Sequence, residues 1–210
     1  MLRVKPSQMT KVLIADDHDL FRSGLSMLLS GNGYEVAAEV KSTDELKKVA
    51  DAAQADIFIL DCQMPSEGPV AMLQWLQWKF PESKVVFLTG LTAGGLFRQL
   101  INLNASALVS KACDIDAVLK ALACCLQGIQ YISDELKPLL EEAEDILTPK
   151  EAKVFEYLLL GKSNREIADI LFNSERTINI HRANIMKKFH AHSIVELLDI
   201  ANKKGYYRAP

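Results

Sequence analysis

The amino-acid sequence predicts an α/β domain built on a doubly wound, five-stranded parallel sheet, followed by a small all-α domain of four helices. Three observations lead to this expectation. Apolar runs alternate with helical stretches from residue 11 to residue 127. Strand-like runs stop after that point, and the helices beyond residue 147 begin with strong capping signals.

The first part of the chain shows the alternation of strands and helices that a parallel sheet requires. Its apolar runs are short and nearly continuous, as expected of strands that are buried on both faces. One of the helical stretches begins with a capping box, in which Ser42 precedes Glu45 by three residues. The predicted strands cover residues 12–15, 36–38, 57–60, 85–88 and 107–109, and the predicted helices cover residues 19–30, 42–53, 69–80, 93–103 and 114–127.

Capping residues also mark the helices of the second part. Thr148 and Glu151 form one expected capping box, Ser163 and Glu166 form another, and Ser174 is placed to cap a third helix. The stretch before these helices is acidic and lacks a clear apolar face, which is typical of a linker. The expected division is a disordered N-terminal extension at 1–10, a first domain at 11–127, a linker at 128–146 and a second domain at 147–210.

Composition and charge restrict the class of protein. No apolar run is long enough to span a bilayer and the N-terminus lacks the layout of a signal peptide, so we expect a cytoplasmic protein without membrane contact. The four cysteines form no CxxC pair, which favours free thiols over a metal or disulfide site. From residue 147 to residue 210 there are eleven Lys and Arg against seven Asp and Glu, whereas the rest of the chain is acidic. This asymmetry suggests that only the second domain meets a polyanion.

Polar residues follow four of the predicted strands. Asp16 and Asp17 come after the first strand, Asp61 after the third, Thr89 at the end of the fourth and Lys111 after the fifth. Parallel strands end at one edge of a sheet, so these residues should share a pocket. Three carboxylates repel each other, and Mg²⁺ with its preference for oxygen ligands relieves that repulsion. The alternatives are helix-capping aspartates and a surface lysine, but five matching positions favour the pocket.

These positions resemble the receiver domains of two-component response regulators of the FixJ/NarL type, whose sheet is flavodoxin-like. The resemblance rests on the sequences Asp16-Asp17-His18 and Asp61-x-x-Met64-Pro65 and covers residues 11–127. It implies that Asp61 accepts a phosphoryl group from a histidine kinase and that Thr89 and Lys111 bind the phosphoryl oxygens. It also implies a Mg²⁺ site made by Asp16, Asp17, Asp61 and the backbone carbonyl of Gln63. Such a receiver catalyses only its own phosphorylation and dephosphorylation and is not a metabolic enzyme.

Two features of this first domain depart from the family pattern. The usual glycine-rich turn after Met64-Pro65 is replaced by Ser66-Glu67-Gly68-Pro69, and Leu108 stands where an aromatic switch residue is common. Neither change touches the residues of the expected phosphorylation pocket. Both bear on how a signal would leave that pocket.

The second domain resembles the LuxR-type helix-turn-helix, most clearly in the sequence from Ser174 to Lys188. Helical periodicity places Ile178, Ile185 and Phe189 on the inner face of this stretch. The opposite face suits a DNA major groove, where Asn179 can pair with adenine and Ile180 can touch a thymine methyl group. Without the motif, a solvated helix surface would be the simpler interpretation. The expected groove residues are Arg176, Asn179, Ile180, Ala183 and Lys187, and the expected phosphate contacts are Lys162, Arg165, Arg182 and Lys188.

The last predicted helix carries one apolar stripe. By the resemblance it pairs two DNA-bound copies, although part of it must also cover the core of its own domain. The expected dimerisation residues are Ile194, Leu197, Leu198 and Ala201. A further feature is the pair Trp75 and Trp78, which lies off the sheet-facing stripe of its helix. The two side chains either cover the rim of the core or dock the linker, the helix-turn-helix domain or an outside partner.

The sequence therefore predicts a homodimeric transcription factor whose binding to two half-sites in double-stranded DNA is controlled by phosphorylation of Asp61. A histidine kinase is the expected phosphodonor, and RNA polymerase is a further candidate partner. The alternative is a DNA-binding regulator that works without phosphorylation and uses its receiver only as a scaffold for dimerisation or docking.

Overall fold

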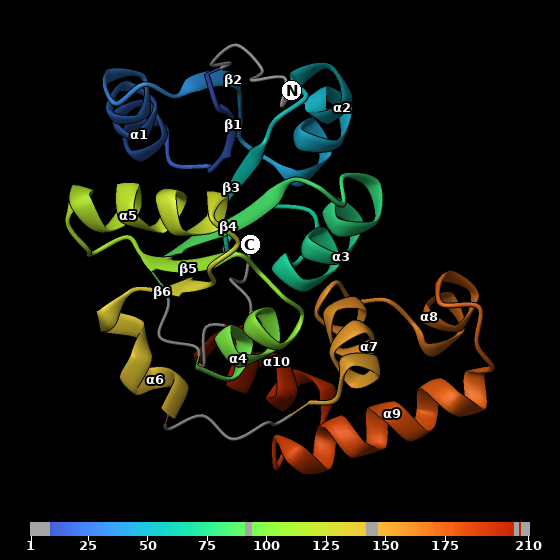
Figure 1. The fold of residues 1–210 in the computed structure, drawn as a ribbon. Helices are drawn as coiled ribbons and strands as arrows, with labels where there is room; N and C mark the ends of the chain where they lie inside the picture. The colour runs from blue at the N-terminus through green and yellow to red at the C-terminus, as the bar shows by residue number, and fades with distance from the viewer. Residues whose placement is uncertain (1–8, 91–93, 142–146, 204–205, 207–210) are drawn as a thin grey trace.

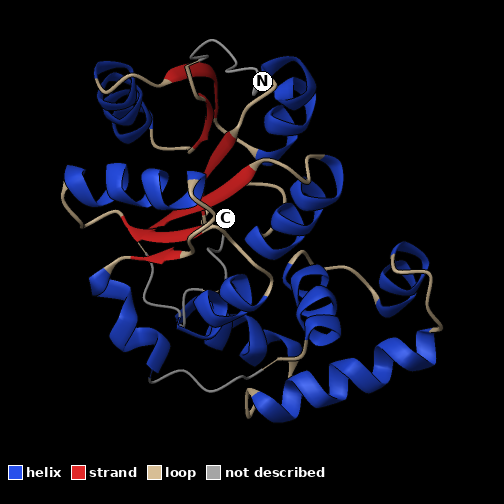
Figure 2. Cartoon of the chain, viewed as in Figure 1, coloured by secondary structure: helices blue, strands red, loops and turns tan. Residues whose placement is uncertain are grey.

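The computed structural model describes residues 9–90, 94–141, 147–203 and 206. Within these residues an α/β domain is followed by a helical domain, as the sequence predicts (Figures 1 and 2). The expected extension at residues 1–10 lies almost wholly outside the described part of the chain.

A parallel sheet forms the centre of the first domain. Its strand order is β2-β1-β3-β4-β5-β6, and each neighbouring pair runs parallel. The order reverses direction between β1 and β3, which places a crevice at the carboxyl ends of these strands. The strands are β1 (Lys11–Ala15), β2 (Glu35–Val40), β3 (Ile57–Asp61), β4 (Lys84–Thr89), β5 (Ala107–Ser110) and β6 (Tyr131–Ile132).

Helices cover both faces of this sheet, and alternate residues of each strand serve the two faces. In β3, Ile57 and Ile59 pack towards one side, whereas Phe58 and Leu60 pack towards the other, and all four are fully buried. Helices α1 (Asp19–Gly31) and α5 (Ile115–Leu126) cover the first side. Helices α2 (Thr43–Ala53), α3 (Pro69–Lys79) and α4 (Gly94–Asn102) cover the second. Each fully buried Leu, Ile or Phe contributes about 1.5–3 kcal/mol of transfer free energy to this core.

The sixth strand corrects the predicted sheet of five strands and comes from the segment assigned to the linker. Tyr131 and Ile132 pair with Ala107 and Leu108 of β5. A 3₁₀ turn, η1 (Asp134–Leu136), and helix α6 (Lys137–Glu141) follow. Leu136 is 2 % exposed and packs into the core of the first domain, and Arg98 of α4 donates to the backbone carbonyl of Leu140. Residues 131–141 are therefore structurally continuous with the first domain.

Four helices form the second domain around one apolar cluster. They are α7 (Pro149–Leu159), α8 (Asn164–Ile170), α9 (Glu175–Lys188) and α10 (Ile194–Lys203). Both predicted capping boxes form, at Thr148 with Glu151 and at Ser163 with Glu166, and the Ser174 side chain caps α9. The rings of Phe155 and Phe189 stack with centroids 4.8 Å apart, which joins α7 to the end of α9.

The two domains touch where α7 meets the N-terminus of α3 (Figure 1). Glu156 of α7 accepts a hydrogen bond from the backbone N–H of Ala71, at 3.2 Å. Helix α3 begins after Gly68, which has no side chain that could cap the helix. The carboxylate of Glu156 supplies an acceptor for the N-terminus of α3 instead. A cavity of about 740 Å³ lies beside this contact and is lined by the loop after β3, α7 and Tyr206.

Candidate functional site

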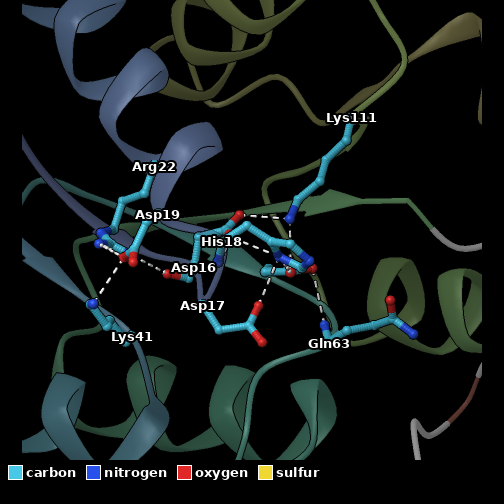
Figure 3. Close-up of polar contacts among 9 residues, drawn as sticks. Asp16, Asp17, His18, Asp19, Arg22, Lys41, Gln63 and Lys111 are labelled. Carbon is cyan, nitrogen blue, oxygen red and sulfur yellow. Dashed lines mark hydrogen bonds and ion pairs between the residues drawn. The ribbon is translucent and has the colours of Figure 1, made fainter.

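The polar residues predicted from the strand ends meet at the carboxyl edge of the sheet. The β3–β4 register pairs Asp61 with Leu88, and the β4–β5 register pairs Thr89 with Ser110, so these three strands end side by side. Asp16 and Asp17 follow β1 directly, and Lys111 follows β5. Figure 3 shows Lys111 and His18 reaching the carboxylates of this edge.

Lys111 links two of the buried carboxylates. Its Nζ lies 2.6 Å from Oδ2 of Asp16 and 2.8 Å from Oδ2 of Asp61, and these aspartates are only 1 % and 4 % exposed. Burial raises the pKa of Asp61, and the ammonium of Lys111 opposes that rise. Burial also lowers the pKa of Lys111, but its pairing with the carboxylates of Asp16 and Asp61 outweighs this, so the net shift is upward. The lysine therefore stays charged and partly neutralises the pocket.

His18 is a member of the pocket to which the sequence analysis gave no role. Its Nδ1 lies 2.8 Å from Asp17, 3.2 Å from Asp16 and 3.7 Å from Asp61. About half of its side chain is exposed, so the ring stands at the mouth of the pocket. Its position directly after the two aspartates was the available signal, because a residue three places past the end of β1 stays close to that edge.

The carboxylates have the arrangement of a cation site. Ligand atoms of Asp16, Asp17, His18 and Asp61 lie within 4.8 Å of one another. Asp16 Oδ2 and Asp17 Oδ1 are shielded from solvent and accept no hydrogen bond of normal geometry from the described residues, although Lys111 and His18 lie close to them. Oxygen ligands with spare lone pairs fit Mg²⁺. The residues present are therefore suited to that ion.

The walls of the pocket hold the phosphoacceptor candidate in place. The backbone N–H of Gln63 donates to Oδ1 of Asp61 at 3.0 Å. Thr89 is fully buried, and its hydroxyl interacts with the thiol of Cys62. Burial raises the pKa of Cys62 well above its ordinary value, so this thiol stays protonated. Fixed donors around one aspartate leave its other oxygen, Oδ2, facing Lys111.

A cationic network fixes the loop that carries the first two aspartates. Arg22 is 8 % exposed and donates to the backbone carbonyl of Asp16 at 2.7 Å. The same guanidinium pairs with Asp19, which also pairs with Lys41 at 2.9 Å (Figure 3). The hydrogen bond from Lys41, followed by that from Arg22, lowers the pKa of Asp19 to about 2. The loop is thus tied to α1 and to the end of β2.

Helix α9 presents the face that was predicted to enter the DNA groove. Ile178 and Ile185 are fully buried and Phe189 is 3 % exposed, so they form the inner side. The five expected groove residues, Arg176, Asn179, Ile180, Ala183 and Lys187, are all exposed. Docking of the two domains therefore leaves this face open in the structure.

The residues expected to contact phosphates differ in their surroundings. Arg165 and Lys162 are exposed, and Lys162 lies 3.4 Å from Glu166. Arg182 is half-buried and donates to Asn164. Lys188 is engaged within the domain, because its Nζ lies 2.7 Å from the carboxylate of Glu151, which is 3 % exposed. A structural role for Lys188 stands beside its proposed contact with DNA.

The expected dimerisation residues divide into two groups. Leu197 and Ala201 are fully buried in the core of their own domain and have no surface to offer a partner. Ile194 and Leu198 are half-buried, and the neighbouring Val195 is 72 % exposed. A dimer contact through α10 in this conformation would thus depend on the second group.

The two tryptophans have different surroundings on α3. Trp75 is half-buried at the rim of the core of the first domain, with Phe80 edge-on at 6.0 Å and the ammonium groups of Lys47 and Lys79 over its ring. Trp78 is 78 % exposed. The rim interpretation fits Trp75, and among the described residues nothing covers Trp78.

A parallel sheet with this carboxylate pocket, joined to a helical domain with an open helix α9, defines the class of response regulators with a DNA-binding output domain. The model of the response regulator receiver domain family matches residues 12–123, and that of the luxR family of bacterial regulatory proteins matches residues 145–201. The chain belongs to the response regulators and carries a LuxR-type domain. It is therefore a transcriptional regulator and not a metabolic enzyme.

Individual relatives match over almost the whole chain. A nitrate/nitrite response regulator protein homolog of Haemophilus influenzae is 33% identical over 192 residues, which cover 88% of this chain and 92% of the relative. The transcription regulator BvgA of Bordetella pertussis is 27% identical over 204 residues, covering 93% and 98%. Among solved structures, RcsB of Salmonella enterica serovar Typhimurium bound to a promoter superposes with a TM-score of 0.72 at 23% identity, covering 92% of this chain and 98% of RcsB. That structure supports the fold alone.

Among the described residues, no helix combines the length and the apolar character needed to cross a bilayer.

Proposed function

We propose that Asp61 accepts a phosphoryl group from a histidine kinase and that this modification controls the binding of α9 to DNA. The observation that carries the proposal is the position of Lys111, whose ammonium lies 2.8 Å from the phosphoacceptor oxygen and pairs with Asp16. An ammonium fixed at this point can neutralise charge that develops on a transferred phosphoryl group.

The chemistry follows from the groups in the pocket. A carboxylate oxygen of Asp61 attacks the phosphorus of a phosphohistidine, so that a P–O bond forms and the P–N bond breaks. Lys111 donates to one phosphoryl oxygen and the hydroxyl of Thr89 donates to another. Hydrolysis by water later returns the free carboxylate. When bound, Mg²⁺ supplies further charge neutralisation.

The metal would be held by four groups, the carboxylates of Asp16, Asp17 and Asp61 and the backbone carbonyl of Gln63. His18 has to leave its present contacts with these carboxylates when a cation binds, or its imidazole nitrogen joins the ligands. The exposed position of the ring allows either outcome, because half of it already faces solvent.

A groove next to Lys111 suits the phosphodonor. It has a volume of about 330 Å³ and lies between α1 and α5. Leu20 at its edge is 90 % exposed and Ile115 is 58 % exposed, an apolar surface that a folded monomer normally covers. The groove borders the phosphorylation pocket, so a kinase that docks there brings its phosphohistidine towards Asp61.

The output is sequence-specific binding of double-stranded DNA. The exposed face of α9 enters the major groove, with the phosphate contacts on either side of it, and a homodimer covers two half-sites. The solved RcsB structures include dimers bound to DNA, which supports this arrangement for the present chain.

DNA and RNA polymerase as partners place the protein in the cytoplasm. The division into a receiver (11–127), a linker (128–146) and a DNA-binding domain (147–210) stays a proposal, and residues 131–141 adjoin the receiver.

Modification of Asp61 can be tested directly. Incubation with a small phosphodonor and Mg²⁺ should add one phosphoryl group, located by mass spectrometry of the peptide that contains Asp61. The variant Asp61→Asn should stay unmodified, and Asp51→Asn, which removes an exposed carboxylate on α2, should be modified like the wild type. Modification that persists in Asp61→Asn would show that the phosphoacceptor lies elsewhere.

A further inference from the structure

Three polar side chains connect α8 to the outer face of α9. Asn164 is the first residue of α8, and Asn179 and Arg182 are three residues apart on α9. The side-chain amide of Asn164 donates to Oδ1 of Asn179 at 2.5 Å. The guanidinium of Arg182 donates to Oδ1 of Asn164 at 3.3 Å. Asn164 therefore bridges a predicted base contact and a predicted phosphate contact.

The donor and acceptor roles in this series of hydrogen bonds are fixed. The two ends of an asparagine amide look alike in shape, so its orientation follows from its partners. Arginine has only donors, so the end of Asn164 that faces Arg182 must be the oxygen. The other end is then the amino group, which needs an acceptor in Asn179. The carbonyl of Asn179 is thereby turned towards Asn164, and its amino group is the end that is left to face outward.

An asparagine whose carbonyl is held towards a neighbouring side chain recognises different bases from a free one. Pairing with adenine uses both ends of the amide, one to accept from the amino group N6 and one to donate to N7. When Asn179 presents only its amino group, it needs an acceptor on the base. Guanine offers two acceptors in the major groove, O6 and N7, whereas adenine and thymine each offer one. Cytosine presents an amino donor in the major groove and no acceptor. The bound amide therefore favours guanine, unlike the adenine contact expected from the sequence.

We propose that Asn164 is a specificity-determining residue: through its hydrogen bond to Asn179 it makes that side chain a donor and directs it to guanine. The inference rests on the proposed function, since it takes Asn179 to face the bases. Asn179 and its neighbour Ile180 are exposed, so the amino group is accessible to a duplex. Asn164 itself is half-buried at the start of α8, beside a capping box that does not use its side chain.

The substitution Asn164→Asp reverses the direction of the hydrogen bonds. The introduced carboxylate keeps an acceptor for Arg182, but it also offers only an acceptor to Asn179. The amide of Asn179 must then turn over, donate to this carboxylate and present its carbonyl to the base. Bases with an amino group in the major groove, adenine and cytosine, become the preferred ones. A carboxylate in the first turn of a helix is favourable, so α8 should form normally.

The test is selection of bound sequences from a randomised duplex library, followed by sequencing, with the full-length protein. Asn179→Ala first identifies the base position that this residue recognises, as the position where preference is lost. At that position the wild type should enrich guanine over cytosine on the order of tenfold, and Asn164→Asp should enrich adenine and cytosine instead. Asn164→Ala releases Asn179 and should shift the preference from guanine towards adenine.

A charge control separates this effect from simple repulsion. Asn184→Asp adds the same charge at another exposed position of α9, and it should weaken binding to all sequences without changing the preferred base. If Asn179→Ala abolishes a preference that Asn164→Asp and Asn164→Ala leave unchanged, the role of Asn164 is refuted and the base contact stands. If Asn179→Ala changes no position, the base contact itself is refuted, and the inference falls with it.

Discussion

Lys111 allows two aspartates to share a nearly solvent-free pocket. Asp16 and Asp61 are each within 2.8 Å of its ammonium, and both are almost fully buried. Two carboxylates so placed would repel each other if the cation were absent. The residue that is proposed to stabilise the phosphoryl group thus also stabilises the metal-free receiver.

We expect Lys111→Met to lower the free energy of unfolding of the receiver by about 2–4 kcal/mol in EDTA, because it leaves buried charge uncompensated. Mg²⁺ should restore much of this loss, since the carboxylates can pair with the added cation. Urea unfolding followed by tryptophan fluorescence measures both quantities. Lys48→Met, at an exposed position on α2, should have little effect. Equal stability of Lys111→Met and wild type in EDTA would contradict this role.

Lys187 and Lys188 are adjacent in sequence, but the structure gives them different surroundings. Lys188 pairs with the buried carboxylate of Glu151, whereas Lys187 is exposed on the groove face. The hydrogen bond from Lys188, together with those from Thr148, outweighs burial and lowers the pKa of Glu151. Sequence periodicity alone could not separate the two lysines, because the partner lies 37 residues away on α7.

The two alanine variants should therefore separate stability from DNA affinity. Lys188→Ala should lower the free energy of unfolding of the helical domain by about 1–2 kcal/mol, because Glu151 loses its partner. The loss is modest because the pair is partly exposed and water can solvate the carboxylate. Lys187→Ala should leave stability within about 0.5 kcal/mol and weaken DNA binding. Thermal unfolding and DNA titration of both variants test this, and a stable Lys188→Ala protein would overturn the structural role.

Strands and helices with a regular apolar pattern were predictable, but β6 was not. Four strands carry runs of buried apolar residues and β2 carries a half-buried apolar run, whereas β6 has only Tyr131 and Ile132. Such a short strand leaves no periodic signal. The acidic stretch that follows β6 resembles a linker in sequence, because its charged residues leave no apolar pattern around Leu136. In the structure Leu136 is 2 % exposed. The burial of Leu136 depends on the pairing of β6 with β5. No local sequence pattern encodes that pairing.

Leu136→Ala should therefore destabilise the receiver although it lies in the expected linker. The loss should be about 2–4 kcal/mol, as for other large-to-small substitutions in a core. Glu135→Ala, at the exposed neighbouring position, is the matched control and should have little effect. Both tryptophans of the chain lie in α3, so their fluorescence during urea unfolding reports on the receiver. Equal midpoints for the two variants would place Leu136 outside the receiver core.

The carboxylate pocket was predicted more completely than the surroundings of the residues proposed to contact DNA. Asp16, Asp17, Asp61, Thr89 and Lys111 follow from strand ends, since parallel strands bring their carboxyl ends together. The contacts of Asn164, Lys188 and Glu156 depend on how helices pack against one another. Charged and polar residues on a helix surface look solvated in sequence, so their partners appear only in the folded chain.

Glu156 is the main polar residue described at the contact between the two domains. One of its oxygens accepts from the N-terminus of α3, and the other is shielded from solvent without a hydrogen-bond partner among the described residues. Burial raises its pKa to about 8, helped by Glu67 and opposed by the backbone N–H groups of Ala71 and Val70 and by Lys153. The contact lies just beyond the loop that carries Asp61, yet it leaves α9 open.

Docking of the domains should depend on pH with a definite sign. When the domains separate, Glu156 returns to an ordinary pKa near 4.5. Its raised pKa in the docked form means that docking is strongest below about pH 4.5 and weakens as pH rises to about 8. Small-angle X-ray scattering should thus show a larger radius of gyration at high pH than at low pH. The variant Glu156→Gln, which cannot ionise, should show a smaller change, and an identical response of both proteins would contradict this assignment.

Fluorescence anisotropy with a selected duplex measures whether phosphorylation of Asp61 controls DNA binding, as proposed. Titrations with and without beryllofluoride and Mg²⁺, for wild type and Asp61→Asn, give four dissociation constants. We expect beryllofluoride to tighten DNA binding by the wild type at least about fivefold and to leave the affinity of Asp61→Asn unchanged. Equal affinities in all four titrations would contradict it and would favour a regulator that binds DNA independently of phosphorylation, with the receiver as a scaffold.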